Sequence, residues 1–203
     1  MHARRVRLIV TSVAAATLPL TSGLLAPQAL ADDAASSSPS ASGTPSPFGP
    51  GCSSLPKNGK GSVRGMATER VAKAAANNPK LTKLALALKE AGLTKQLDGA
   101  KHITVFAPTN EAFDKVPKAQ LANLMKSRAE LKKVLEYHVV DKTITPSELP
   151  KGSFKTLEGS KLKTSGSGMS FKVNDKAKIV CGDIRTANAT VYLVDTVLMP
   201  PAQ

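Results

Sequence analysis

The segment TVFAPTNEAF, residues 104–113, joins a short apolar strand to the first turn of a helix. Its β-branched and aromatic residues are typical of a buried strand. Pro108 ends that strand, because its ring fixes φ and removes a backbone donor. Thr109 or Asn110 then supplies a side-chain oxygen that can cap the helical turn. The segment therefore predicts a strand that leads directly into a helix.

Helical patterns lie on both sides of this segment. Residues 66–77 repeat apolar side chains along one face, and Asn78-Pro79 then begins a second amphipathic helix that ends near Gly92. Further along, Ser127 and Glu130 have the spacing of a capping box and begin a helix that leads into Tyr137. The first half of the domain is therefore expected to be mostly helical.

Short strand patterns separated by turn residues fill the C-terminal part of the chain. Gly182-Asp183 is among the predicted turns. The expected strands cover 154–157, 161–164, 169–173, 178–181 and 190–198. Helices followed by a meander of strands favour an α+β fold.

Two further segments complete a family pattern. LEYHVV covers residues 135–140, and DIRTANATVYLVDTVLMPP covers 183–201. Together with 104–113, and in this order, they resemble the fasciclin (FAS1) domain family over about residues 53–201. The likeness is strongest to secreted immunogenic members from mycobacteria. It implies a single FAS1 domain, an antiparallel β-wedge of two short sheets with helices packed alongside.

The resemblance also implies a function in cell adhesion and two candidate binding positions. Tyr137 and His138 match the family's Tyr-His motif, and Asp183 and Ile184 match its Asp-Ile adhesion motif. From the residues alone each pair has an alternative interpretation. His138 is either catalytic or a hydrogen-bonded structural residue. Asp183-Ile184 is either an exposed patch or a turn carboxylate followed by a core residue. We expect an exposed adhesion patch at these four residues.

The N-terminus is typical of a secretory signal. Residues 1–31 combine arginines, an interrupted apolar stretch and a small-residue cleavage site at Ala29-Leu-Ala31. Residues 32–51 are rich in Ser, Pro and Gly and are expected to form a disordered spacer. The folded domain is then expected over 52–203. These features predict a secreted protein, extracellular or associated with the cell wall, without stable membrane insertion after cleavage.

The net charge limits the class of partner, and the cysteines predict a covalent link within the chain. The chain has 28 Lys and Arg against 15 Asp and Glu, a net charge of +13. The basic surface either aids solubility or attracts a polyanion. Nucleic acid is disfavoured, because only 3% of residues are aromatic and base stacking needs aromatic platforms. Cys52 and Cys181 are the two cysteines, and an even count in an exported chain predicts a disulfide.

Signatures of enzymes and cofactors are missing from the sequence. It has no G-x-S-x-G elbow, no phosphate-binding glycine loop and no short-spaced set of metal ligands. We therefore expect no catalytic residue, no cofactor and no metal. The predicted partner is an extracellular protein or a wall or matrix polysaccharide, bound by a monomer. The alternatives are an electrostatic wall-coating protein, a secreted hydrolase with an unrecognised site, and a carrier with an apolar pocket.

Overall fold

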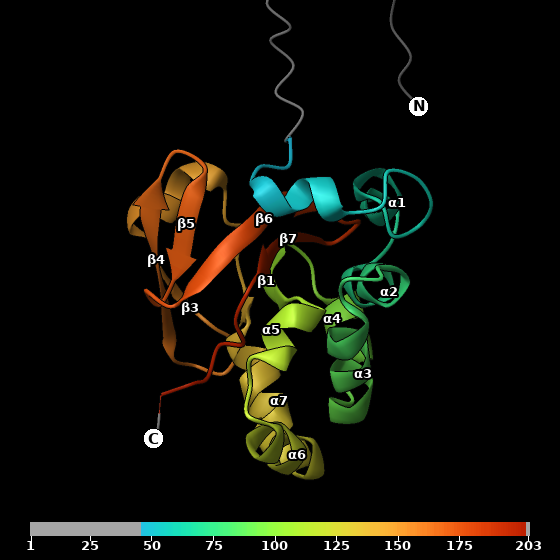
Figure 1. Cartoon of the computed structure of the whole chain (residues 1–203), viewed down its shortest axis with the longest axis vertical. Helices are drawn as coiled ribbons and strands as arrows, with labels where there is room; N and C mark the ends of the chain where they lie inside the picture. The colour runs from blue at the N-terminus through green and yellow to red at the C-terminus, as the bar shows by residue number, and fades with distance from the viewer. Residues whose placement is uncertain (1–45, 202–203) are drawn as a thin grey trace, which may run out of the picture. The chain divides into compact units, whose positions relative to one another are not determined.

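The computed structural model describes residues 46–201, which combine helices and strands (Figure 1). The helices are α1 (Val63–Ala67), α2 (Val71–Asn77), α3 (Thr82–Ala91), α4 (Thr94–Gly99), α5 (Asn110–Asp114), α6 (Lys118–Lys126) and α7 (Arg128–Tyr137), with 3-10 turns η1 (Pro50–Ser54) and η2 (Pro146–Lys151). The strands are β1 (Ile103–Pro108), β2 (Val139–Val140), β3 (Ser153–Lys155), β4 (Lys161–Ser167), β5 (Ser170–Val173), β6 (Ala177–Arg185) and β7 (Ala189–Val194).

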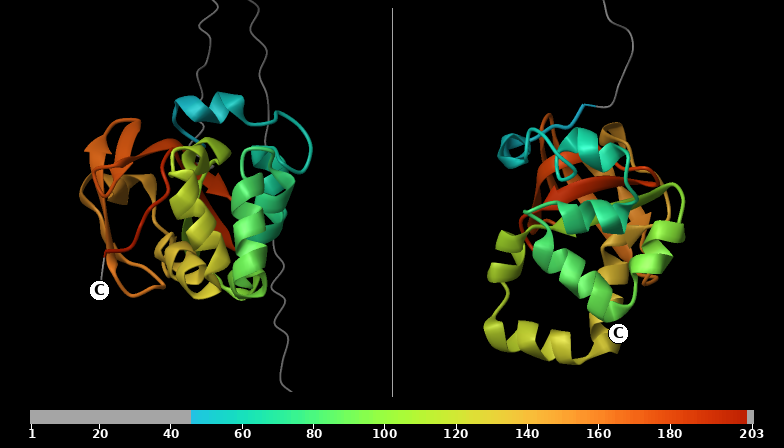
Figure 2. Two further views of the ribbon diagram at one scale, coloured as in Figure 1. Left: turned by 60° about the horizontal axis from the view of Figure 1, so that its bottom comes forward. Right: turned by 90° about the vertical axis from the view of Figure 1, so that its right-hand side faces the viewer.

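The strands form one hydrogen-bonded series in the order β2-β1-β7-β6-β5-β4-β3. Helices α1–α4 lie on one side of β1 and β7, and strands β3–β5 lie on the other (Figures 1 and 2). The α+β wedge expected from the sequence is confirmed. One pair differs from the antiparallel expectation, because β1 and β7 run parallel from Ile103↔Ala189 to Pro108↔Val194. Strand β7 pairs with β1 only after the chain has formed α5–α7 and β2–β6.

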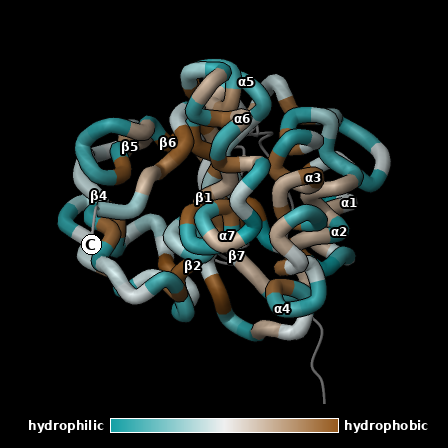
Figure 3. The backbone as a smooth tube through the Cα atoms, turned by 90° about the horizontal axis from the view of Figure 1, so that it is seen from below, coloured by the Kyte–Doolittle hydropathy of each residue, from teal (hydrophilic) through white to brown (hydrophobic). Residues whose placement is uncertain are grey.

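The parallel pair β1 and β7 divides the interior into two apolar clusters. Val105 and Val191 pack with the helices, whereas Phe106 and Tyr192 pack with the strands β3–β6. Because neighbouring side chains of a strand point to opposite faces, both strands are buried along their whole length. Figure 3 shows the apolar segments of β1 and β6 in the middle and hydrophilic turns outside. The core thus fixes both strands that carry the family segments.

The helix expected over 66–77 is divided in two. Helix α1 ends at Ala67, and α2 begins at Val71 after an extended residue, Arg70 (φ −70°, ψ 152°). The backbone carbonyl of Glu69 in this break accepts a hydrogen bond from Ala187 N–H at 2.8 Å. The carbonyl exposed by this break therefore makes a long-range hydrogen bond. The apolar periodicity of residues 66–77 did not indicate the break.

Strand β6 continues to Arg185, so the turn expected at Gly182-Asp183 is wrong. Gly182 pairs with Phe48, with backbone N···O distances of 3.2 and 2.8 Å. A Cβ at Gly182 would lie 2.5 Å from Phe48 Cζ, so glycine is needed here for close approach. Asp183 adopts φ +55° in a register shift between Cys181 and Ile184, which makes a β-bulge.

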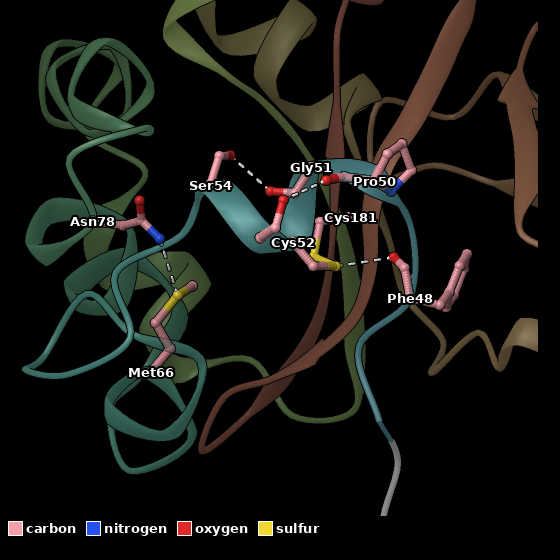
Figure 4. The surroundings of a disulfide bond; sticks show 9 residues. Phe48, Pro50, Gly51, Cys52, Ser54, Met66, Asn78 and Cys181 are labelled. Carbon is pink, nitrogen blue, oxygen red and sulfur yellow. Dashed lines mark hydrogen bonds between the residues drawn. A yellow bond between two sulfur atoms is a disulfide. The ribbon is translucent and has the colours of Figure 1, made fainter.

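The predicted disulfide between Cys52 and Cys181 is confirmed, with the two Cα atoms 4.9 Å apart. It places η1 across β6 (Figure 4). Contacts with the domain extend into the predicted spacer, because Phe48 bridges Gly182 and its ring lies 5.6 Å from that of Phe171. Residues 1–45, which include the predicted signal and most of the spacer, lie outside the described residues. Within 46–201, no helix is both long and apolar enough to cross a bilayer.

Candidate functional site

Asp183 occupies the bulge of β6, and its side chain is turned inward rather than exposed. The residue is 3% exposed, and its Oδ1 lies 2.9 Å from Nε of Arg185. Neither atom has a hydrogen-bond partner within the described range, so this contact is an ion pair. Burial raises the pKa of the Asp183 carboxyl, and the Arg185 guanidinium opposes that rise. The carboxylate therefore serves to position Arg185.

Ile184, the second residue of the predicted Asp-Ile patch, has no exposed surface. Its side chain belongs to the apolar cluster under the helices. The expectation of an exposed Asp-Ile pair is therefore wrong for this structure. The alternative interpretation, a carboxylate at a backbone irregularity followed by a core residue, describes the arrangement, with a bulge in place of the turn.

Tyr137 ends α7 and connects that helix to a strand hairpin. Its hydroxyl donates to the carbonyl of Lys161 at 3.2 Å and accepts from Nδ2 of Asn174 at 2.7 Å. Asn174 takes a left-handed backbone conformation, φ +50°, in the turn after β5. Tyr137 is 3% exposed, so it joins helix to hairpin and offers almost no surface to a partner.

His138 joins α7 to the C-terminal segment and is 1% exposed. Its Nε2 accepts a hydrogen bond from Leu198 N–H at 3.0 Å. Nδ1 therefore carries the proton in the neutral ring and donates to the carbonyl of Val134 at 2.7 Å. Burial lowers the pKa of His138 to about 4, although the Val134 carbonyl opposes this. With both ring nitrogens bonded to backbone, the structural interpretation of His138 describes this geometry.

The two predicted pairs do not form one surface patch. No hydrogen bond or ion pair between the pairs occurs within 46–201. The described part of the chain also has no group of three or more His, Cys, Asp or Glu placed to hold a metal ion. All four side chains hold elements of the fold together, so a binding surface must be sought beside them.

Two surface depressions meet at Arg185. The first, which we call the 185–190 hollow, has a volume of about 310 Å³ and is bordered by Arg70, Lys101 and His102. The second, which we call the 52–69 groove, has a volume of about 1210 Å³ and extends from the disulfide-bonded N-terminal segment to α1. Arg185 lines both depressions. Asp183 also lines the 52–69 groove, although it is almost fully buried. The segment that carries the Asp-Ile motif therefore reaches a surface mainly through Arg185.

Asn188 fixes the wall of the 185–190 hollow. Its Oδ1 accepts from Val71 N–H at 2.9 Å, and its Nδ2 donates to the carbonyls of Leu97 and Ala100 at 2.7 and 2.9 Å. The side chain thereby connects the turn before β7 to α2 and α4. Asparagine offers both an acceptor and two donors, and all are used here.

Sequence reasoning missed Arg70, Lys101, His102 and Arg185 as surface neighbours. These residues come from the α1–α2 break, the start of β1 and the end of β6, and only the tertiary fold brings them to one hollow. The one local signal was their charge, in a chain whose basic residues are spread throughout. His102 also has φ +59°, an uncommon backbone conformation for a residue other than glycine.

Comparison with known proteins gives sequence relatives from mycobacteria. The chain is 47% identical over 150 residues to the cell surface glycolipoprotein MPB83 of Mycobacterium bovis, and this match covers 71% of this chain and 67% of that protein. It is 40% identical over 200 residues to the immunogenic protein MPB70 of the same species, and this match covers 95% of each. These matches bear out the likeness to mycobacterial proteins.

A solved structure and a family model agree with these relatives. A FAS1 domain pair from the insect cell adhesion molecule Fasciclin I superimposes with a TM-score of 0.60 at 17% identity, covering 67% of this chain and 52% of that one. This likeness concerns the fold, and the chain spans about half of that domain pair. The family model described as the Fasciclin domain matches residues 79–200. Because this model matches residues 79–200 and the 40% identity to MPB70 extends over 95% of the chain, this chain belongs to the fasciclin domain family.

Proposed function

We propose that this protein is an extracellular, non-enzymatic adhesion module that binds a protein or polysaccharide of a cell surface or matrix. One observation carries the proposal. Arg185 is held by the buried Asp183 where the 185–190 hollow and the 52–69 groove meet. The cell-surface and cell-adhesion names of the relatives support an extracellular location and this class of function.

The proposed contact surface differs from the one expected from the sequence. Asp183 and Ile184 support this surface from inside, and Arg185 and Ala187 face the partner. Tyr137 and His138 hold α7 to the β4–β5 hairpin and the C-terminal segment, away from this surface. An Asp183→Ala variant is therefore a poor test, because it removes the partner of a half-buried arginine and perturbs the bulge. A cleaner test obstructs the hollow with an exposed side chain.

The test is co-sedimentation of the protein with bacterial cell walls, and separately capture on immobilised fibronectin, at low and high salt. Ala187 is exposed and lines the 185–190 hollow, so Ala187→Glu introduces bulk and negative charge there. Ala129→Glu, at an exposed position of α7 outside both depressions, makes the same change as a matched control. We expect salt-resistant binding to one surface, weakened by Ala187→Glu and retained by Ala129→Glu.

Other outcomes identify the alternatives. Binding that disappears with salt and falls equally in both variants would indicate electrostatic wall coating, a possibility favoured by the net charge of +13. Saturable turnover of an ester, peptide or glycan would replace the proposal with a hydrolase. Absence of binding to both surfaces would contradict the adhesion function itself.

A further inference from the structure

The two depressions that meet at Arg185 have an excess of positive charge. The 185–190 hollow has Arg70, Lys101 and Arg185 on its border and no carboxylate among its lining residues, all of which lie in the described range. The 52–69 groove adds further lysine and arginine side chains. Taken together, the two depressions are lined by the following Lys and Arg residues: Arg70, Lys101, Arg185, Lys57, Lys60 and Arg64.

The two carboxylates on this surface are already engaged. Glu69 accepts from Nδ2 of Asn77 at 2.6 Å, and Asp183 is paired with Arg185. By contrast, Lys57, Lys60 and Lys101 take part in no ion pair within residues 46–201. The uncompensated charge of the combined surface is therefore positive, and it attracts an anionic ligand.

Two cations of this surface are held by protein groups, whereas three exposed lysines, which we call the rim lysines, have no such partner within the described range. Arg185 is positioned by Asp183, and the Arg70 guanidinium donates to the backbone carbonyl of Asp98. Lys57, Lys60 and Lys101 are exposed and free to follow a ligand. Fixed charges lower the ordering cost of binding, and flexible lysines adapt to an irregular spacing of anionic groups.

The remaining lining residues can contact a carbohydrate backbone. The 52–69 groove presents Pro47, Pro56, Val63 and Ala67, whose apolar surfaces can cover the C–H faces of sugar rings. None of the described residues that line either depression is Phe, Tyr or Trp, so this surface offers no such platform for stacked bases. The combined opening, larger than a site for one small anion, suits several consecutive units of a polymer.

We propose that the joined depressions bind an anionic polysaccharide, its acidic groups held by Arg185, Arg70 and the three rim lysines. This inference rests on the proposed adhesion function and specifies the ligand class of the same surface. The acidic group can be a carboxylate, as in a uronate polymer, or a sulfate or phosphate ester on a sugar chain. These groups share negative charge and several acceptor oxygens, and the experiment separates them.

The test uses the exported protein and isothermal titration with polygalacturonate, dextran sulfate, uncharged dextran and duplex DNA. The triple variant Lys57→Gln/Lys60→Gln/Lys101→Gln removes three rim charges. The matched control, Lys155→Gln/Lys172→Gln/Lys176→Gln, removes three exposed lysines that line neither depression. We expect binding of at least one acidic polysaccharide, weakened about tenfold or more in the rim variant and less than about threefold in the control.

Each result supports or overturns the inference. Preference for polygalacturonate over dextran sulfate would assign the acidic group as carboxylate, and the opposite preference would assign it as an ester anion. Equal loss of affinity in both triple variants, or DNA binding as tight as polysaccharide binding, would show that net charge alone drives binding. Either result would overturn the proposed polysaccharide site. If no polysaccharide binds but the cell-wall or fibronectin assay succeeds, the ligand class is wrong while the adhesion proposal stands.

Discussion

His138 predicts that this protein loses stability in mild acid. In the fold, its ring is buried and bonded through both nitrogens to the backbone of α7 and of the C-terminal segment. Its pKa is lowered from 6.5 to about 4, chiefly by burial. The unfolded chain therefore binds a proton at His138 at a higher pH than the folded chain does, and lowering the pH favours unfolding.

The magnitude follows from the two pKa values. The full shift from 6.5 to about 4 corresponds to about 3 kcal/mol, since one pKa unit equals about 1.4 kcal/mol. At pH 7.5 almost none of this penalty applies, because the unfolded histidine is also neutral. At pH 5.0 the unfolded histidine is protonated and the folded one is not, so the free energy of unfolding falls by about 2 kcal/mol.

The assay is urea unfolding followed by far-UV circular dichroism at pH 7.5, 6.5, 5.5 and 5.0. His138→Gln is the reference, because a glutamine oxygen can accept from Leu198 N–H and does not titrate. Carboxylates such as Asp183, whose pKa is raised, contribute to both proteins and largely cancel in the difference. We expect the wild type to lose about 2 kcal/mol more than the variant between pH 7.5 and 5.0. Parallel curves for the two proteins would refute the argument that the buried ring resists protonation.

Three further changes test how the site is supported, each measured by urea unfolding. Reducing Cys52–Cys181, which closes a separation of 129 residues, should lower stability by about 2–5 kcal/mol, and an unchanged midpoint would show that the bridge constrains little. Asn188→Ala should cost about 3 kcal/mol for three hydrogen bonds, and a loss below about 1 kcal/mol would contradict its role. Gly182→Ala should cost about 1–3 kcal/mol by displacing Phe48. Gly99→Ala is the control, because no atom lies within 4 Å of the added carbon there and the backbone has no positive φ.

Much of the fold was predictable because its signals are local. The strand ending at Pro108, the αL cap at Gly92 (φ +73°) and the Ser127 side chain that accepts from Glu130 N–H all depend on neighbours within a few residues. The disulfide required only a count of cysteines and an exported chain. Such features survive in the structure because tertiary contacts support the same local preferences.

The errors came from contacts between distant segments. In the break before α2, the Glu69 carbonyl accepts a hydrogen bond from Ala187 N–H. Within β6, Gly182 pairs with Phe48 of the predicted spacer instead of forming a turn. The inward orientation of Asp183 follows from the β-bulge in β6. Local periodicity does not report Ala187 or Phe48 as partners, because each lies more than a hundred residues from the group that it contacts. The bulge forms against the neighbouring strand β7, and no periodic pattern indicates it either.

The segment that begins at Asp183 divides its residues between two tasks. Asp183, Ile184 and Asn188 turn inward, where they hold a bulge, fill the core and tie β7 to two helices. Arg185 and Ala187 turn outward, and they line the depressions together with the largely buried Asp183 and the half-buried Asn188. A substitution at an inward residue acts on stability before it acts on binding, and so does one at Arg185, because it leaves the buried Asp183 carboxylate unpaired. Ala187, which is exposed, can be changed at little cost to the fold. Family membership therefore transfers the scaffold of this surface, and the ligand must be inferred from the charges that this chain places around it.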